Sequence, residues 1–181
     1  MSVIKANEIQ DLNGNVILNT NNRIKFLQVV SGESTTLISY NSSSTASPNI
    51  RNYYNLDNSV SLTTVGENSS FFITGYAQCA VVLVNTTPFA RCNIGFSVTN
   101  GSTTTRISGV DGTFGDSWGP NSAPQGSTLN RSTLWTPNTQ LNSGVTLTFN
   151  LLGAQYDVGN IRWNNAPYGH NNTITVMEFA A

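Results

Sequence analysis

The chain holds one histidine and two cysteines, side chains that often carry catalysis or bind metal ions. His170 lies in a short polar stretch, and no serine or cysteine in a nucleophile-elbow pattern accompanies it. Cys79 and Cys92 with a single histidine cannot supply the four ligands of a usual zinc site. These residues therefore predict neither a nucleophilic catalytic centre nor a metal site.

The carboxylates show no spacing that would pair two of them for acid–base work. Glycoside hydrolysis needs two facing carboxylates, and Asp111, Asp116, Asp157 and Glu178 follow no such motif. The segment from Asp111 to Asp116 lacks the spacing of a calcium-binding hand, so its aspartates are interpreted as turn formers. We expect no enzymatic activity and no cofactor.

Aromatic rings and amides occur together in two stretches that could bind a sugar. Aromatic faces stack on sugar rings, and amides donate and accept hydrogen bonds with hydroxyl groups. The candidate glycan-binding residues are Trp118, Trp163, Asn164 and Tyr168. The alternative is that the tryptophans belong to the core or to a subunit interface.

The two cysteines lie in apolar runs, 71–84 and 90–98, that a turn-like Asn85-Thr86-Thr87-Pro88 separates. If the runs form a hairpin, the cysteines sit opposite each other or nearly so. A disulfide is one interpretation. Two small buried thiols are the other, and the reducing cytosol favours them.

Charge is scarce: 8 Lys and Arg and 9 Asp and Glu make up 9% of 181 residues, whereas about a quarter is usual. In their place stand 25 Asn, 22 Thr and 20 Ser. A net charge of −1 without a basic stripe argues against nucleic-acid and lipid partners.

The longest uncharged apolar stretch, 77–84, is far shorter than the roughly 20 residues that cross a bilayer. The first residues lack the apolar region of a secretory signal, so we expect a product of a cytosol with no membrane partner.

From Phe26 onward, apolar and polar residues alternate with period two, and turn residues separate the runs. No segment has helical periodicity. The expected strands are 26–30, 35–39, 60–65, 71–84, 90–99, 103–110, 129–135, 145–151 and 173–179. About nine strands with this spacing predict an all-β antiparallel sandwich, and a jelly roll is its natural closure. Gly75 indicates a bulge or bend within its strand.

The first 25 residues differ from the rest and hold both lysines of the chain. Asn13-Gly14 is a strong hairpin signal, but two strands alone cannot bury enough surface, so this segment needs something to dock on. We expect a docking arm over residues 1–25 and a jelly-roll domain over 26–181. The docking residues are Val3, Ile4, Lys5, Ile9, Leu12, Val16, Ile17, Leu18 and Lys25.

The last strand is apolar on both faces, with Ile174 and Val176 on one and Met177 and Phe179 on the other. A terminal strand of a soluble monomer should present one face to water. Either this strand is central in a sheet, or its second face meets another subunit.

Both ends of the expected domain resemble those of a known family. The sequences Phe26-Leu27-Gln28-Val29-Val30-Ser31 and Thr173-Ile174-Thr175-Val176-Met177-Glu178-Phe179-Ala180 are similar to the ends of a domain of bacteriophage, particularly cyanophage, virion proteins. Residues 5–15 resemble the start of phage tail-fibre and other minor structural proteins. The resemblance implies a trimeric jelly roll, comparable with C1q and tumour-necrosis-factor heads, displayed on a virion.

The resemblance leads to a specific functional expectation. The expected trimer interface is Phe71, Tyr76, Met177 and Phe179. The sequence has no collagen-like, heptad or β-helix repeat that would form a fibre shaft, which favours a capsid decoration (cement) protein whose arm docks on the major capsid protein. The alternatives are a short tail fibre or tail-associated protein that binds a host surface glycan, and a free C1q-like domain of cellular origin. The expected location is the virion, after synthesis in the host cytoplasm.

Overall fold

The computed structural model describes residues 8–10, 16–19, 25–42, 52–82, 89–108, 115–118, 125–155, 159–163 and 171–180. Within these residues every regular element is a strand, which confirms the all-β prediction. The strands are β1 (Glu8–Gln10), β2 (Val16–Asn19), β3 (Lys25–Ser34), β4 (Ile38–Ser42), β5 (Asn52–Thr63), β6 (Ser70–Val82), β7 (Phe89–Asn100), β8 (Thr103–Ser108), β9 (Gly115–Trp118), β10 (Gln125–Trp135), β11 (Thr146–Gln155), β12 (Gly159–Trp163) and β13 (Asn172–Ala180).

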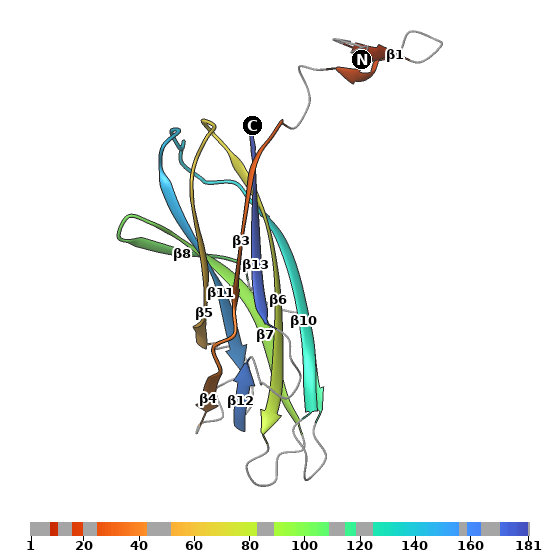
Figure 1. The fold of residues 1–181 in the computed structure, drawn as a ribbon, viewed down its shortest axis with the longest axis vertical. Coiled ribbons are helices and arrows are strands. Elements are labelled where there is room, and N and C mark those ends of the chain that lie inside the picture. Colours follow the sequence, from red (N-terminus) through yellow and green to blue (C-terminus); the bar gives the residue numbers. More distant parts are fainter. Residues whose placement is uncertain are drawn as a thin grey trace.

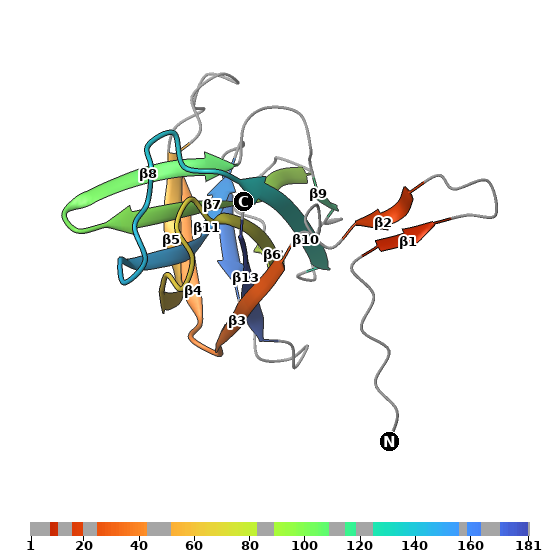
Figure 2. The same ribbon diagram turned by 90° about the horizontal axis from the view of Figure 1, so that it is seen from above.

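Two antiparallel sheets make up the sandwich (Figures 1 and 2). One has six strands in the order β3-β13-β6-β12-β4, with β10 also paired to β6. The other has five strands in the order β5-β11-β7-β8, with β9 paired to β7. The structure therefore has more strands than the nine expected, because β9 and β12 lie in stretches that had no strand pattern. Among the described strands, β1 and β2 form a separate two-stranded sheet.

Strand pairing is nested along the chain. β3 pairs with β13, β5 with β11, β6 with β10, and β7 with β8, so the first strand of the sandwich lies beside the last. Successive strands β5, β6 and β7 alternate between the two sheets. The two ends of the sandwich meet where Lys25 pairs with Ala180, so the sandwich begins one residue before the expected boundary.

The core lies between the sheets and consists of the inward-facing apolar side chains of strands in which apolar and polar residues alternate. In β13, Ile174 and Val176 are fully buried while the alternating threonines are half-buried. Phe71 of β6 meets Phe149 of β11 across the sandwich with ring centroids 5.4 Å apart. Burial of these large side chains is the main stabilising contribution to the fold.

Gly75 does not mark a bulge, so that part of the prediction is wrong. The pairing of β6 with β10 and with β13 continues through Gly75 without a change of register. A Cβ at this position would lie 2.6 Å from Phe96 Cε1 and 2.8 Å from Leu151 Cδ1. The glycine is needed because side chains of the opposite sheet occupy the space above it.

Candidate functional site

The outer faces of the two sheets differ in chemistry, and this difference identifies the candidate site. On the five-stranded sheet, hydroxyl groups of neighbouring strands bond to each other. The pairs are Ser61 with Thr148 at 2.7 Å, Thr63 with Thr146 at 3.1 Å, and Thr99 with Thr104 at 2.8 Å. Hydroxyl ladders of this kind suit a face that meets water.

The six-stranded sheet carries an apolar row on its outer face. Met177 of β13 lies opposite Val29 of β3 on one side and Phe72 of β6 on the other, and Phe72 lies opposite Leu134 of β10. Side chains at these positions point out of the same face because they are in register across four strands. Val29 is 50% exposed and Leu134 is 66% exposed, so nothing in the described part of the chain covers the two ends of the row.

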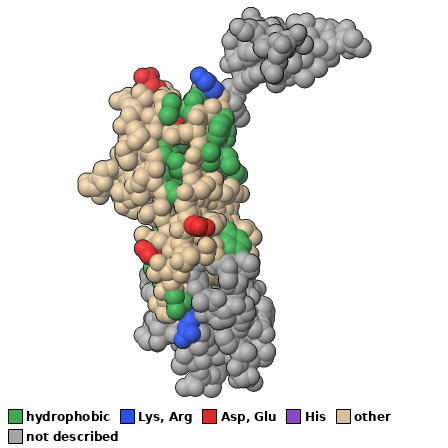
Figure 3. Space-filling view, viewed as in Figure 1, with side chains coloured by type: hydrophobic (Ala, Val, Ile, Leu, Met, Phe, Trp, Pro, Cys, Tyr) green, Lys and Arg blue, Asp and Glu red, His purple; other side chains and the backbone are tan. Residues whose placement is uncertain are grey.

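Phe26 and Phe179 extend this row toward the chain ends. The register between β13 and β3 shifts between Glu178 and Phe179, which places Phe179 opposite Phe26 with ring centroids 5.8 Å apart. Phe26 is 52% exposed. We call this set the apolar belt; it comprises Phe26, Val29, Phe72, Leu134, Met177 and Phe179. Figure 3 shows hydrophobic side chains gathered in the half of the molecule nearest the C-terminus.

The belt is bordered by hydroxyl groups. The next row across the sheet is Ser31, Thr175, Thr74 and Ser132, read from the same register. Ser31 Oγ and Thr175 Oγ1 are 2.9 Å apart. Glu33 stands one row further, so the belt and its border contain no charged side chain.

Three of the four expected interface residues lie on this outer face. Met177 and Phe179 belong to the belt, and Tyr76 lies opposite Thr173 two rows below Phe72. Phe71 is the exception: its side chain is fully buried and contacts Trp135 and Phe149 inside the sandwich. A second chain cannot reach Phe71 without opening the core, so the prediction that Phe71 lies at an interface is wrong.

The structure also corrects the glycan assignment of Trp163. Its side chain is fully buried, its indole N–H donates to the Tyr54 hydroxyl, and the two rings pack edge-to-face with centroids 6.3 Å apart. It therefore offers no face on which a sugar could stack. Trp118 ends β9 opposite Phe89, and only its backbone is described. Asn164 and Tyr168 lie outside the described residues, as does His170.

The expected docking arm is described in part. Ile9 and Leu18 are register partners in the sheet that β1 and β2 form, and Val16 and Ile17 belong to β2. Val3, Ile4, Lys5 and Leu12 lie outside the described residues.

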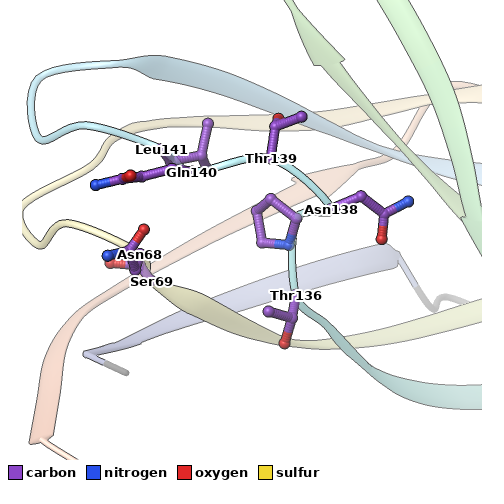
Figure 4. A pocket seen from close by; sticks show the side chains of 8 residues that line it. Asn68, Ser69, Thr136, Asn138, Thr139, Gln140 and Leu141 are labelled. Atoms are coloured by element: carbon purple, nitrogen blue, oxygen red, sulfur yellow. The ribbon is translucent and has the colours of Figure 1, made fainter.

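A shallow notch lies between the loop before β6 and the loop after β10 (Figure 4). Its volume is about 280 Å³. The lining residues are Asn68, Ser69, Thr136, Pro137, Asn138, Thr139, Gln140 and Leu141. The lining holds no charged or aromatic side chain and its surface is mostly apolar, so the notch offers a ligand apolar contact and a few neutral hydrogen bonds. The sequence pattern had not indicated it, because its two loops are distant in the chain.

Directly behind the belt, Glu178 is a fully buried carboxylate. It accepts hydrogen bonds from the backbone N–H of Val65 and Gly66, each at 3.1 Å, from the Ser69 hydroxyl at 2.6 Å and from Gln28 Nε2 at 2.5 Å. Burial alone would raise the pKa of Glu178, but these hydrogen bonds together hold it below its ordinary value. Because Glu178 lies between Met177 and Phe179, the network fixes the strand that carries the belt's centre.

The part of the chain that the structure describes holds no group of three or more His, Cys, Asp or Glu side chains that could bind a metal ion. None of its elements is a helix long and apolar enough to span a membrane. The sequence matches no protein-family model and none of the curated proteins with which it was compared.

Proposed function

We propose that this protein is a non-enzymatic virion structural protein that assembles into a homotrimer through the apolar belt and docks on the particle through its N-terminal segment. The observation that carries the proposal is the apolar belt on the outer face of the six-stranded sheet. Contiguous apolar surface on a protein otherwise coated with Asn, Ser and Thr marks an interaction site.

A second copy of the chain is the partner that this chemistry favours. The belt and its hydroxyl border hold no charge, so two copies can meet without placing like charges together. A hydroxyl group both donates and accepts hydrogen bonds, which makes the border complementary to itself. Most soluble oligomers are closed symmetric assemblies of one chain, and around a three-fold axis the belts of three copies would face one another.

The nested strand pairing supports the jelly-roll form of the sandwich. Eight strands of the sandwich pair as first with last, second with seventh, third with sixth and fourth with fifth, which is the pairing of a double Greek key. In chain order these strands are β3, β5, β6, β7, β8, β10, β11 and β13. This agrees with the resemblance of residues 26–31 and 173–180 to the virion domains comparable with C1q and tumour-necrosis-factor heads.

The position of β3 supports a docking role for the segment that precedes it. β3 begins at Lys25, and the next residue, Phe26, belongs to the belt. In a trimer packed through the belt, three N-terminal segments would leave from neighbouring points and act together, which raises effective affinity. We favour the major capsid protein as the partner. A short tail fibre or tail-associated protein is the alternative location.

The first experiment tests assembly with two matched variants of the full-length chain. Val29→Asp/Leu134→Asp places charges in the belt, and Ser61→Asp/Thr104→Asp places the same number on the hydroxyl-rich face of the other sheet. Light scattering after size-exclusion chromatography should give a trimer for the wild type and the second variant, and a folded monomer for the first. A wild-type monomer at all concentrations, or a belt variant that stays trimeric, contradicts the proposal.

The second experiment tests docking. A chain that lacks residues 1–24, and so keeps Lys25 and the whole of β3, should remain trimeric but no longer sediment with particles. Immunogold labelling of whole particles then distinguishes head from tail. A shortened chain that still decorates particles contradicts the docking role of the N-terminal segment.

A further inference from the structure

The two cysteines face each other across the sandwich. Cys79 lies in β6 of the six-stranded sheet, and Cys92 lies in β7 of the five-stranded sheet. Both side chains are fully buried, and both are present as thiols. Their sulfur atoms are 2.9 Å apart, between the length of a disulfide bond, about 2.05 Å, and the roughly 3.5–4.0 Å at which non-bonded heavy atoms rest.

The positions of the two cysteines would make a bond between them a link between sheets. Cys79 has Trp163 of β12 and Ser127 of β10 as its register neighbours, so it lies inside its sheet and not at an edge. Cys92 likewise lies between Gln155 of β11 and Gly115 of β9. A bond here would join the interior strands of both sheets directly.

Metal binding does not account for the pair. In the part of the chain that the structure describes, no third His, Cys, Asp or Glu joins the two thiols in a group that could hold a metal ion. A structural zinc site needs four ligands. At this separation the two thiols share an S–H···S contact, and a two-electron oxidation would bring the same sulfur atoms to bonding distance.

We propose that Cys79 and Cys92 form an intrachain disulfide that joins the two sheets when the protein meets an oxidising environment. With oxidised glutathione as the oxidant, one cysteine thiolate attacks the glutathione disulfide and releases one glutathione thiolate. The second cysteine thiolate then attacks the protein sulfur of the mixed disulfide and releases the second glutathione. The two cysteines lose two electrons and two protons, and the glutathione disulfide gains them as two thiols.

Burial decides when the reaction can occur. Because neither thiol is exposed, glutathione reaches them during folding or when the sheets open locally, and the bond is then shielded from reductants in the closed sandwich. Disulfides persist outside the reducing cytosol, including on virion surfaces. The inference requires neither the trimer nor the virion. Under the proposed function, the protein would meet an oxidising environment when particles are released from the cell.

The test uses the full-length protein in a glutathione redox buffer. Samples equilibrated in native buffer and in denaturant are quenched, and remaining thiols are labelled with N-ethylmaleimide in denaturant for intact-mass measurement. At the same ratio of reduced to oxidised glutathione, the disulfide-to-dithiol ratio should be about a hundredfold higher in native buffer than in denaturant. A bond that closes the short loop between Cys79 and Cys92 stabilises the folded state relative to the unfolded chain by about this factor. Peptide mapping should link Cys79 to Cys92 within one chain.

A second measurement asks whether the folded geometry favours the bond. The oxidised protein should melt roughly 5–10 °C above the reduced protein. Cys79→Ala and Cys92→Ala, which keep a small apolar side chain at each site, should show the same Tm in oxidising and reducing buffers. Complete labelling of both thiols after oxidation, a bond between two chains, or an oxidised Tm equal to or below the reduced one would each overturn the inference.

Discussion

Glu178 accepts a 2.6 Å hydrogen bond from the hydroxyl of Ser69, which lies 109 residues earlier in the chain. The same carboxylate accepts the backbone N–H groups of Val65 and Gly66. The last strand of the sandwich is thereby attached to the loop that precedes β6. Since Met177 and Phe179 flank this anchor and belong to the apolar belt, the network connects the stability of the fold to the geometry of the proposed assembly surface.

The stability of the protein should fall in acid as Glu178 takes up a proton. Its pKa in the folded state lies below the ordinary value of 4.5, so the unfolded chain binds the proton first as the pH falls. The stabilisation from Glu178 is complete above pH 4.5 and is lost as the pH falls through the lower pKa of the folded state. Urea unfolding at neutral pH and at successive values below 4.5 measures this. Glu178→Gln should lack this part of the pH dependence, and parallel curves for the two proteins would contradict the assignment.

Replacement of the buried carboxylate should cost stability at neutral pH. In Glu178→Gln an amide NH₂ would face groups that themselves donate, the Gln28 amide and the Val65 N–H, so at least one partly buried donor loses its acceptor. We expect a loss of about 3 kcal/mol in the free energy of unfolding. Glu33→Gln, on an exposed residue of the same sheet, is the matched control and should change the free energy by no more than about 0.5 kcal/mol. Equal effects of the two variants would argue against the network.

Gly75→Ala should destabilise the fold through overpacking. The added methyl group would meet Phe96 and Leu151 at distances well inside van der Waals contact, which costs about 1–3 kcal/mol. Gly101→Asn is the contrasting variant, because Gly101 has a φ of 58° and nothing within 4 Å of its Cβ position. Asn tolerates this left-handed conformation, so chemical denaturation should show little change. A Gly75→Ala protein as stable as the wild type would mean that the opposite sheet moves away easily.

The Trp163→Ala variant should be less stable than the wild type. It should not lose a binding function selectively. Its ring is fully buried, and a cavity of this size costs about 3–5 kcal/mol. Thermal melting measures the loss. A variant that keeps the wild-type Tm but loses binding on a glycan array would restore the sugar-binding interpretation of this residue.

The proposed trimer should not weaken as salt is added. The belt and its border hold no charged side chain, and salt screens only interactions between charges. Analytical ultracentrifugation at low and high salt concentration tests this on the wild-type chain. Dissociation into monomers at high salt would show that charged residues outside the belt hold the subunits together.

The fold class was readable from the sequence, whereas two of its strands were not. Alternation in segments such as 145–151 predicts a half-buried strand with only local information, and β11 occupies that place. β9 and β12 were missed because they lie among Gly, Pro and Asn residues and form by pairing with β7, β6 and β4. Strands of this kind depend on the neighbours that complete their hydrogen bonds, which no local pattern records.

The candidate surface was predicted in part for the same reason. A last strand that is apolar on both faces indicated either a central place in a sheet or a contact with another subunit. β13 is central, between β3 and β6, and Met177 and Phe179 lie on the outer face of that sheet. Val29 and Leu134 gave no separate signal, since an isolated apolar residue at the end of a short run is ordinary. They belong to the belt only because the register across β3, β13, β6 and β10 brings them into one row.

Side-chain alternation and composition are local properties, and they were enough to indicate an all-β chain with an uncharged polar coat. Which side of each strand faces the core depends on the packing of the two sheets. Phe71 and Phe72 are the same residue type at adjacent positions, yet Phe71 is fully buried between the sheets and Phe72 lies in the apolar belt. The cysteines show the same limit: the sequence leaves a hairpin of the two cysteine-bearing strands open, but β6 and β7 belong to different sheets, so the two sulfur atoms meet across the core. Alternation places neighbours on opposite faces, and only pairing with distant strands decides which face is buried.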